Sequence, residues 1–507
     1  MEGQLSIIPK PVSVKYKEGC FQSRGLPSVT GDEVFKNEIE TFMGQMGDCF
    51  NTTGKNASFN REIKAVCQKG LKTENDEAYR LNIFNDKITI EAATPKGMYH
   101  GLQTFRQLVL SQFRDGTLTL PCAEINDYPR FSWRGFMLDC SRYFYTVPFI
   151  KKLIDVISLH HLSRFHWHLT DDQGWRLPVA EYPLLTEIGS RRLNNRLQEQ
   201  IYCGGFYTEE EIREVVDFAA KRHIEIIPEV DLPGHASAIL ASYPGLGCTG
   251  GPYRVEDRFG IFEDVLCAGN DQIFDLAAKV FDALVKLFPS KWVHIGGDEV
   301  LFNRWKDCPK CQKRLADTGL KKTAELQSWI TCRLVRLLAE RGKTAIGWDE
   351  ILDDSEKFKL PKEAVVMSWR GEAGGIRASG LGHQAIMTPN THGCYLDYKH
   401  IDTPEEPGQL YAGAVSVYKS YSMEPAPQKI KSKNAPLILG GQCNLWSELI
   451  YAGKIAEYMI FPRLCAIAEA VWTPGEDKDF KDFSRRLAIH QGRLDSLGIN
   501  QYRGALR

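Results

Sequence analysis

Two patterns of hydrophobic and polar positions divide the chain near residue 127. Residues 79–91 alternate with a period of two around Asn85 and Asp86, which predicts a β-hairpin with a two-residue turn. Residues 97–113 place apolar side chains at helical spacing, so a helix should cover one face of the same sheet. We therefore expect residues 1–127 to form a small, non-catalytic α+β domain.

From residue 128 to residue 507 strand-like and helix-like segments alternate, which is typical of βα units around a parallel sheet. Amphipathic helices are predicted at residues 147–162, 209–222, 273–288 and 323–341. The strand candidates are residues 133–140, 165–169, 224–228, 292–295, 344–348, 364–369, 384–388 and 437–442. Eight strands favour an α/β fold with a (β/α)8 TIM barrel as the catalytic domain, and a doubly wound open sheet is the alternative. A basic C-terminal helix beginning near residue 482 should pack on this barrel.

Charged and aromatic residues stand at the downstream ends of most predicted strands. They are Asp139, Arg142, Asp171, Asp172, Asp231, His235, Asp298, Glu299, Trp348, Asp349, Trp369, Trp446 and Glu448. Barrel enzymes place their active sites at the C-terminal ends of the strands. This distribution therefore predicts an enzyme.

The segment at residues 292–299, WVHIGGDE, is the most informative of these strand ends. Neighbouring side chains of a strand point to opposite faces, so Asp298 and Glu299 can share a site only if the backbone leaves strand geometry. Gly296 and Gly297 permit that change. Two crowded carboxylates repel each other and raise one pKa, as proton donation near neutral pH requires.

Composition narrows the class of partner. The 507 residues include 63 Lys and Arg against 64 Asp and Glu, which does not favour a nucleic acid or an anionic membrane as partner. The 10 Trp, 19 Tyr and 25 Phe residues supply flat apolar faces suited to sugar rings. We find no stretch long and apolar enough for a membrane span and no signal segment at residues 1–6, although a removed signal would leave the same sequence. Compartment, whether cytoplasmic or exported to the periplasm or medium, and oligomeric state stay open.

Metal-binding patterns are weak in the sequence. Cys308 and Cys311 form the only CxxC motif, and without a second CxxC or paired histidines it favours a local structural role over a zinc site. Cys248 and Cys267 flank a glycine-rich loop and are candidates for a disulfide in an exported protein.

His166 and His168 form an HxH pair near Asp171 and Asp172, which keeps a metal-dependent hydrolase of the amidohydrolase kind as a rival interpretation.

Four motifs in order resemble the β-N-acetylhexosaminidases of glycoside hydrolase family 20. They are WRGFMLDCSR at 133–142, FHWHLTDDQGWR at 165–176, IPEVDLPGH at 227–235 and HIGGDE at 294–299. The resemblance covers nearly the whole chain, since residues 7–11 and the hairpin–helix region look like the non-catalytic N-terminal domain of that family.

The resemblance implies an exo-acting retaining glycosidase that removes terminal β-linked N-acetylglucosamine or N-acetylgalactosamine from a glycan. In this family the 2-acetamido group of the substrate is the nucleophile, so no metal or other cofactor is implied. Glu299 would protonate the leaving oxygen. Asp298 would accept a hydrogen bond from the acetamido N–H, and Tyr395 would hold the acetamido carbonyl oxygen.

Further positions match family residues that bind the sugar. Arg142 matches the ligand of O3 and O4, and Asp397 and Glu448 match acceptors for hydroxyls at O4 and O6. Walls of the sugar pocket are expected from Trp348, Trp369 and Trp446, and a supporting pair near the acid from Asp171 and His235.

One departure from the family concerns the segment at residues 411–418, which has no tryptophan where some relatives have one. A related activity that releases a disaccharide therefore remains an alternative, together with a catalytically dead, sugar-binding barrel. The presence of Asp298, Glu299 and Tyr395 argues against the dead barrel.

Overall fold

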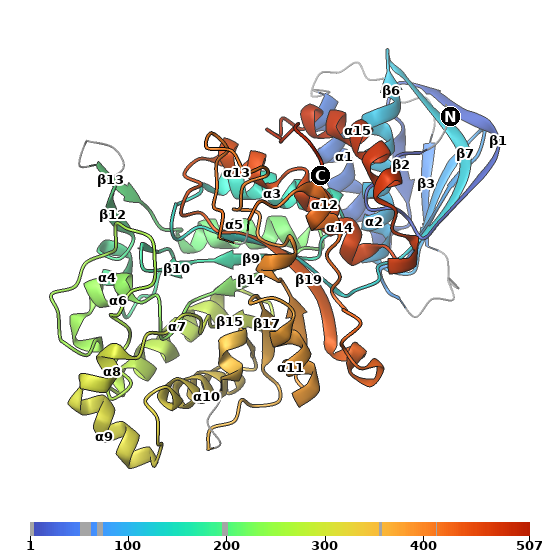
Figure 1. Ribbon diagram of the computed structural model, residues 1–507. Coiled ribbons are helices and arrows are strands. Elements are labelled where there is room, and N and C mark those ends of the chain that lie inside the picture. The colour runs from blue at the N-terminus through green and yellow to red at the C-terminus, as the bar shows by residue number, and fades with distance from the viewer. Residues whose placement is uncertain (1–4, 51–61, 68–74, 195–200, 354–356, 412) are drawn as a thin grey trace.

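The computed structural model describes residues 5–50, 62–67, 75–194, 201–353, 357–411 and 413–507. They form an N-terminal sheet with helices on one face, followed by a closed barrel (Figure 1). The last strand of the sheet, β7 (Thr117–Asp127), ends shortly before the first barrel strand, β8 (Trp133–Asp139). We place the domain boundary in the segment between them.

The N-terminal sheet has the strand order β1-β7-β4-β5-β3-β2. Besides β7, its strands are β1 (Ser13–Arg24), β4 (Tyr79–Ile83), β5 (Ile88–Ala92), β3 (Glu62–Cys67) and β2 (Ser28–Gly31). Strands β4 and β5 pair antiparallel, which confirms the predicted hairpin. Helices α1 (Lys36–Phe50) and α2 (Pro95–Gln112) lie together on the sheet (Figure 1). Thr94 caps α2 by accepting a hydrogen bond from the Gly97 N–H, and Pro95 occupies the first turn.

All eight predicted barrel strands are present and parallel. After β8 they are β9 (Arg164–His168), β14 (Glu225–Glu229), β15 (Trp292–His294), β16 (Thr344–Trp348), β17 (Val365–Ser368), β18 (Ala385–Met387) and β19 (Ile438–Leu445). Strand β19 pairs with β8 and closes the barrel. It continues beyond the predicted end at residue 442, because Cys443, Asn444 and Leu445 still pair with β8. The open sheet is thereby excluded.

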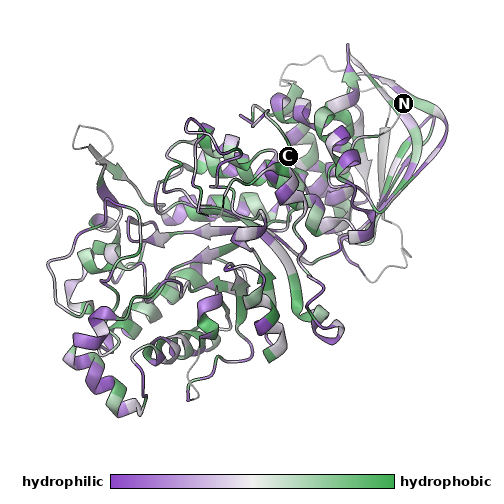
Figure 2. Cartoon of the chain, viewed as in Figure 1, coloured by the Kyte–Doolittle hydropathy of each residue, from purple (hydrophilic) through white to green (hydrophobic). Residues whose placement is uncertain are grey.

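The four predicted amphipathic helices are found as α3 (Val147–Leu159), α5 (Glu209–Ala220), α7 (Gln272–Leu287) and α10 (Glu325–Ala339). Each buries its apolar face in the core that also contains the strand residues. A capping box between Thr208 and Glu211 fixes the start of α5. Figure 2 shows hydrophobic residues at the start of β19 and hydrophilic residues dominating the peripheral helices α8 (Asn303–Asp307) and α9 (Pro309–Thr318).

The C-terminal helix α15 (Phe480–Ser496) contacts both domains, whereas the sequence predicted contact with the barrel alone (Figure 1). Arg486 donates a hydrogen bond of 2.8 Å to the Ile7 carbonyl oxygen and also pairs with Glu469 of α14 (Arg463–Trp472) at 2.7 Å. Arg486 therefore joins the two domains. No helix in the described ranges has both the length and the apolar character needed to cross a bilayer.

Candidate active site

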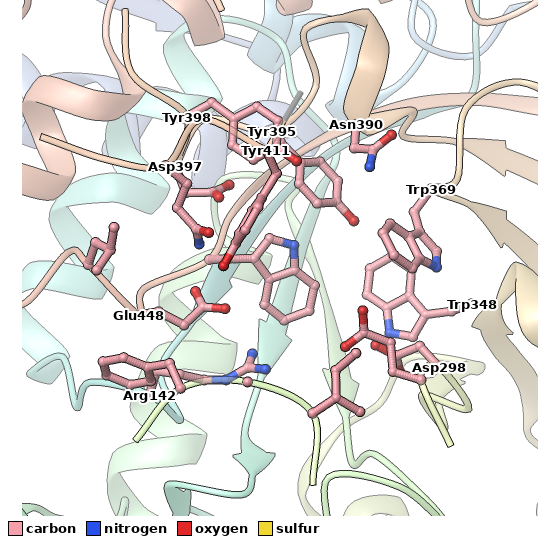
Figure 3. Close-up of a pocket in the computed structure, with 17 residues that line it drawn as sticks. Arg142, Asp298, Trp348, Trp369, Asn390, Tyr395, Asp397, Tyr398, Tyr411 and Glu448 are labelled. Atoms are coloured by element: carbon pink, nitrogen blue, oxygen red, sulfur yellow. The ribbon is translucent and has the colours of Figure 1, made fainter. Parts of the chain in front are cut away.

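A cavity of about 560 Å³ opens at the C-terminal ends of the barrel strands. Every site residue predicted from the sequence lines it except Asp171 and His235. Figure 3 shows Arg142, Asp397 and Glu448 on one side, with Asp298 and Trp369 on the other. The cavity is thus lined by carboxylates, one guanidinium group and aromatic rings.

The backbone after β15 turns both acids of the GGDE segment into this cavity. Gly296 and Gly297 have φ values of 66° and 96°, and Glu299 itself has a φ of 51°. A Cβ atom on Gly296 would lie 1.7 Å from Asp231 Oδ1, so no other residue fits there. The Gly297 N–H donates a 2.9 Å hydrogen bond to the same oxygen. The predicted departure from strand geometry is therefore confirmed.

Asp298 lies in a cluster of acidic groups with Asp231, which the sequence analysis placed at a strand end without assigning it a role. Burial, reinforced by the neighbouring Asp231, raises the pKa of Asp298 well above its ordinary value. Burial also raises the pKa of Asp231 to about 7. The side chain of Asp298 is only 11% exposed, whereas that of Glu299 is 32% exposed. Glu299 is therefore the more accessible of the two acids.

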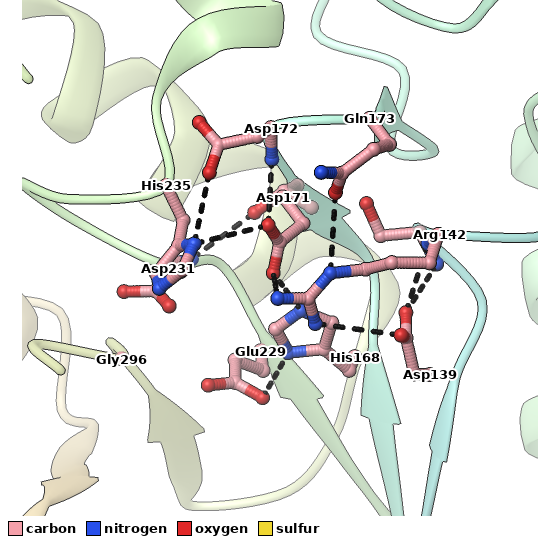
Figure 4. Close-up of polar contacts among 12 residues, drawn as sticks. Asp139, Arg142, His168, Asp171, Asp172, Gln173, Glu229, Asp231, His235 and Gly296 are labelled. Carbon is pink, nitrogen blue, oxygen red and sulfur yellow. Dashed lines mark hydrogen bonds and ion pairs between the residues drawn. The ribbon is translucent and has the colours of Figure 1, made fainter. Parts of the chain in front are cut away.

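His235 is the positive charge beside these acids, and Figure 4 shows its contacts with Asp171 and Asp172. Its Nε2 lies 3.8 Å from Asp298 Oδ2 and 3.6 Å from Glu299 Oε2. Its other ring nitrogen, Nδ1, lies 2.9 Å from Asp172 Oδ2 and 3.1 Å from Asp171 Oδ1. Burial opposes the charged form, but Asp171 and Asp172 raise the pKa of His235 well above its ordinary value. The imidazolium form is therefore favoured.

Asp171 links this histidine to Arg142, which lines the cavity. Its Oδ2 lies 2.8 Å from Arg142 Nη2, while Arg142 Nε donates a 3.2 Å hydrogen bond to Gln173 Oε1 (Figure 4). The guanidinium group also lies 5.0 Å from the centre of the Trp446 ring. Asp171 and His235 thus lie behind the cavity in contact with residues that line it, and their supporting role stays a prediction.

Three carboxylate oxygens of this cavity, which are Asp298 Oδ1, Asp397 Oδ1 and Glu448 Oε2, are buried and find no hydrogen-bond donor among the residues that the structure describes. Burial, followed by the charge of Glu448, raises the pKa of Asp397 well above its ordinary value. Unpaired buried acceptors are costly. A ligand rich in O–H and N–H groups would relieve that cost.

Aromatic rings form the remaining walls. Trp348 and Trp446 lie 5.7 Å apart at 46°, and Trp369 stacks with Tyr395 at 6.3 Å. Carboxyl oxygens hold two of these indoles, since Trp348 Nε1 donates to Glu229 Oε1 and Trp369 Nε1 donates to Glu350 Oε2, each at 2.9 Å. The walls are therefore fixed before any ligand binds.

Tyr395 is positioned by contacts that the sequence did not indicate. The adjacent Leu396 N–H donates a 2.8 Å hydrogen bond to the Asn444 carbonyl oxygen of β19. The buried Arg463 donates 2.7 Å hydrogen bonds to the carbonyl oxygens of Leu396 and Tyr398. The loop that contains Tyr395 is thereby attached to the barrel on both sides.

Several lining residues were not predicted. They are Phe259, Gly260, Ile261, Asn390, Tyr398, Gln409, Tyr411 and Leu449. Most lie on loops without periodicity, where sequence offers no signal. Tyr398 is the exception, because it stands in the same short segment as Tyr395 and Asp397.

The histidines of the metal-hydrolase interpretation lie beneath the cavity and do not line it. His166 Nε2 lies 2.9 Å from the Glu229 carboxylate, and His294 Nδ1 lies 2.8 Å from it. His168 is hydrogen-bonded to the same carboxylate. All three histidines are fully buried. A catalytic metal needs a coordination position open to substrate. This cluster does not offer one.

Comparison with known proteins agrees with this geometry. The family model "Glycosyl hydrolase family 20, catalytic domain" matches residues 131–475, and "Glycosyl hydrolase family 20, domain 2" matches residues 4–128. A beta-hexosaminidase of Porphyromonas gingivalis is 42% identical over 84% of the chain, and one of Vibrio furnissii is 36% identical over 78%. The chain spans 55% and 65% of the lengths of these two relatives.

Solved structures show the same arrangement. The GH20 exo beta-N-acetylglucosaminidase of Vibrio harveyi, in complex with N-acetylglucosamine, superposes with a TM-score of 0.89 at 32% identity, over 98% of this chain and 78% of that one. The GH20 beta-N-acetylhexosaminidase of Streptomyces coelicolor gives a TM-score of 0.83 at 29% identity, over 98% and 97%. Both domains therefore match models of one family, and the chain belongs to glycosyl hydrolase family 20.

Proposed function

We propose that this chain is an exo-acting, retaining β-N-acetylhexosaminidase, which removes terminal β-linked N-acetylglucosamine or N-acetylgalactosamine from glycans. The observation that supports it most is the grouping of Asp298, Glu299 and Tyr395 in one cavity that also contains unpaired carboxylate oxygens. The names of the relatives and of the solved structures agree with this activity.

The proposed reaction uses the acetamido group of the substrate as nucleophile. Its carbonyl oxygen attacks the anomeric carbon while the glycosidic bond breaks, and Glu299 gives its proton to the leaving oxygen. Asp298 accepts a hydrogen bond from the acetamido N–H, and Tyr395 donates one to the carbonyl oxygen. Water activated by Glu299 then opens the oxazolinium-like intermediate, with net retention at the anomeric carbon.

Recognition of the hydroxyl groups of the terminal sugar is assigned to the side of the cavity opposite Asp298. Arg142, Asp397 and Glu448 would bind its hydroxyl groups, and the indole walls would cover its ring and acetamido methyl group. Asp397 is 2% exposed, which favours a closed end for one sugar over a site for a disaccharide. Tyr411 lines the cavity with 87% exposure and offers a ring to the next sugar.

The activity is tested by comparing an aryl β-N-acetylglucosaminide with the matching aryl β-glucoside. We expect hydrolysis of the acetamido sugar alone, with inhibition by a thiazoline analogue of the cyclic intermediate. Cleavage of both sugars without inhibition would contradict the proposal, because it would require a nucleophile from the enzyme.

Replacing His235 by glutamine should move the acidic limb of the kcat/KM profile to higher pH. The imidazolium of His235 lowers the pKa of Asp298, so its removal raises that pKa further and Asp298 is ionised only at higher pH. We expect a shift of about one pH unit, since an opposite charge at this range lowers a pKa by ~1–3 units. His392→Gln, an exposed histidine, is the control. An acidic limb that stays in place would show that His235 does not act on Asp298.

Glu350 should tolerate replacement by glutamine but not by alanine. Burial, reinforced by Asp298 and Asp349, raises the pKa of Glu350 to about 9, so its side chain is neutral at pH 7. Glu350→Gln keeps a neutral acceptor for Trp369 Nε1 and should remain within about threefold of the wild-type kcat/KM. Glu350→Ala leaves that N–H unpaired and should raise KM about tenfold. Equal losses in steady-state assays of the two variants would refute this role.

A further inference from the structure

Four cysteines from three separate parts of the sequence meet beside the active-site loops. Cys248 and Cys267 flank the loop at residues 249–266, and Cys308 and Cys311 stand at the start of α9. Their sulfur atoms all lie within 4.8 Å of one another. The sequence analysis treated these two pairs separately, and the fold unites them.

Three of the six sulfur–sulfur distances are known individually, and each matches a tetrahedral metal site. They are 3.8 Å for Cys248 to Cys311, 3.7 Å for Cys267 to Cys308 and 3.5 Å for Cys267 to Cys311. Zinc–sulfur bonds of about 2.3 Å place the sulfurs of a regular tetrahedron about 3.8 Å apart. A disulfide would bring two sulfurs to about 2.05 Å. Here Cys267 lies almost equally far from Cys308 and Cys311, which favours four equivalent ligands.

The backbone around the sulfurs is shaped to hold them. Cys267, Cys308 and Cys311 are buried, and Cys248 is partly exposed. Gly269 packs so tightly against the Lys310–Cys311 peptide that an added Cβ would lie 2.2 Å from its carbonyl carbon. The Gly269 N–H is hydrogen-bonded toward the sulfurs of Cys267 and Cys311. Such N–H groups stabilise metal-bound thiolates, because they donate toward the negative charge.

We propose that Cys248, Cys267, Cys308 and Cys311 bind one structural zinc ion as four thiolates. The CxxC motif then supplies half of a closed Cys₄ site, so the interpretation of this motif as a purely local feature is replaced. Thiolates select soft ions, and a tetrahedral set of four sulfurs is typical of zinc. All four coordination positions belong to the protein, so the ion has no part in the chemistry.

The site connects two segments that reach the sugar cavity. The loop between Cys248 and Cys267 contains Phe259, Gly260 and Ile261, which line the cavity. The chain from Glu299 passes through α8 directly to Cys308. Zinc would therefore fix the cavity wall and the acid-bearing segment relative to each other, which gives the ion a positioning role for substrate binding.

The metal content of the full chain tests this proposal. Protein purified without chelators, or reduced under argon and supplied with zinc, should contain about one zinc per chain by elemental mass spectrometry. Cobalt(II) in place of zinc should show sulfur-to-metal charge transfer and the visible bands of a tetrahedral tetrathiolate. Protein that binds neither ion under these conditions, or whose four cysteines form two disulfides by peptide mapping, would overturn it.

A pair of variants separates the site from general loss of cysteine. Cys308→Ser/Cys311→Ser should lose the zinc and raise KM more than it lowers kcat. Cys122→Ser, a buried cysteine of the N-terminal domain hydrogen-bonded to Asn85, should keep both the metal and KM. Because metal content and cobalt spectra do not depend on turnover, they would stand even if the proposed glycosidase activity failed. Full zinc content in the double variant would disprove the ligand assignment.

Discussion

Replacing Glu299 by glutamine is expected to lower kcat/KM about 10²- to 10⁴-fold for substrates whose leaving group must be protonated. The backbone at Glu299 has a φ of 51°, and its side chain is the more exposed of the two acids. That position lets it serve first the leaving oxygen and then water. An aryl glycoside with a strongly acidic phenol as leaving group needs little protonation, so its first step should lose much less.

The comparison of the two substrates is the decisive part of this test. Glu340→Gln, an exposed residue at the end of α10, controls for the substitution itself and should leave both rates unchanged. Equal losses of Glu299→Gln on activated and unactivated substrates in steady-state assays would refute the acid role.

Asp298→Asn should reduce kcat about 10²- to 10³-fold while changing KM far less, because the carboxylate acts on charge that develops after binding. Asp298 Oδ1 is buried, and among the described residues only the neighbouring Asp231 carboxyl group, when protonated, could share a hydrogen bond with Asp298. An asparagine keeps the shape but removes the negative charge that stabilises the oxazolinium-like intermediate.

The exposed Asp402→Asn variant is the control for Asp298→Asn. Stopped-flow and steady-state measurements would separate binding from turnover. An unchanged kcat in Asp298→Asn would remove this residue from the mechanism.

The barrel and the acid pair were predictable because they depend on local patterns. Periodicity located each strand, and the two glycines before Asp298 indicated the turn that the φ values of Gly296 and Gly297 confirm. Motif resemblance located the residues of the cavity that stand at strand ends, such as Trp348. Asp171 and His235 were also located in this way, but the sequence did not show that they lie behind the cavity rather than in its lining.

The remaining features depend on contacts between distant segments, which no local pattern encodes. Asp231 belongs to a recognised motif, but its contact with Gly297 exists only in the folded barrel. Arg463 stands in a helix and holds carbonyl groups of a distant loop. The four-cysteine cluster was missed for the same reason, since no spacing within residues 248–267 indicates a partner at Cys308.

Neighbouring-group attack by the substrate is the central claim, and its most direct test varies the nucleophile. Rates would be measured for aryl glucosaminides whose N-acetyl group contains no, one, two or three fluorine atoms. Each fluorine withdraws electrons from the carbonyl oxygen, so kcat/KM should fall steeply through the series if that oxygen attacks the anomeric carbon. A nearly constant kcat/KM would contradict the account, because it would mean that a nucleophile other than the acetamido group forms the intermediate.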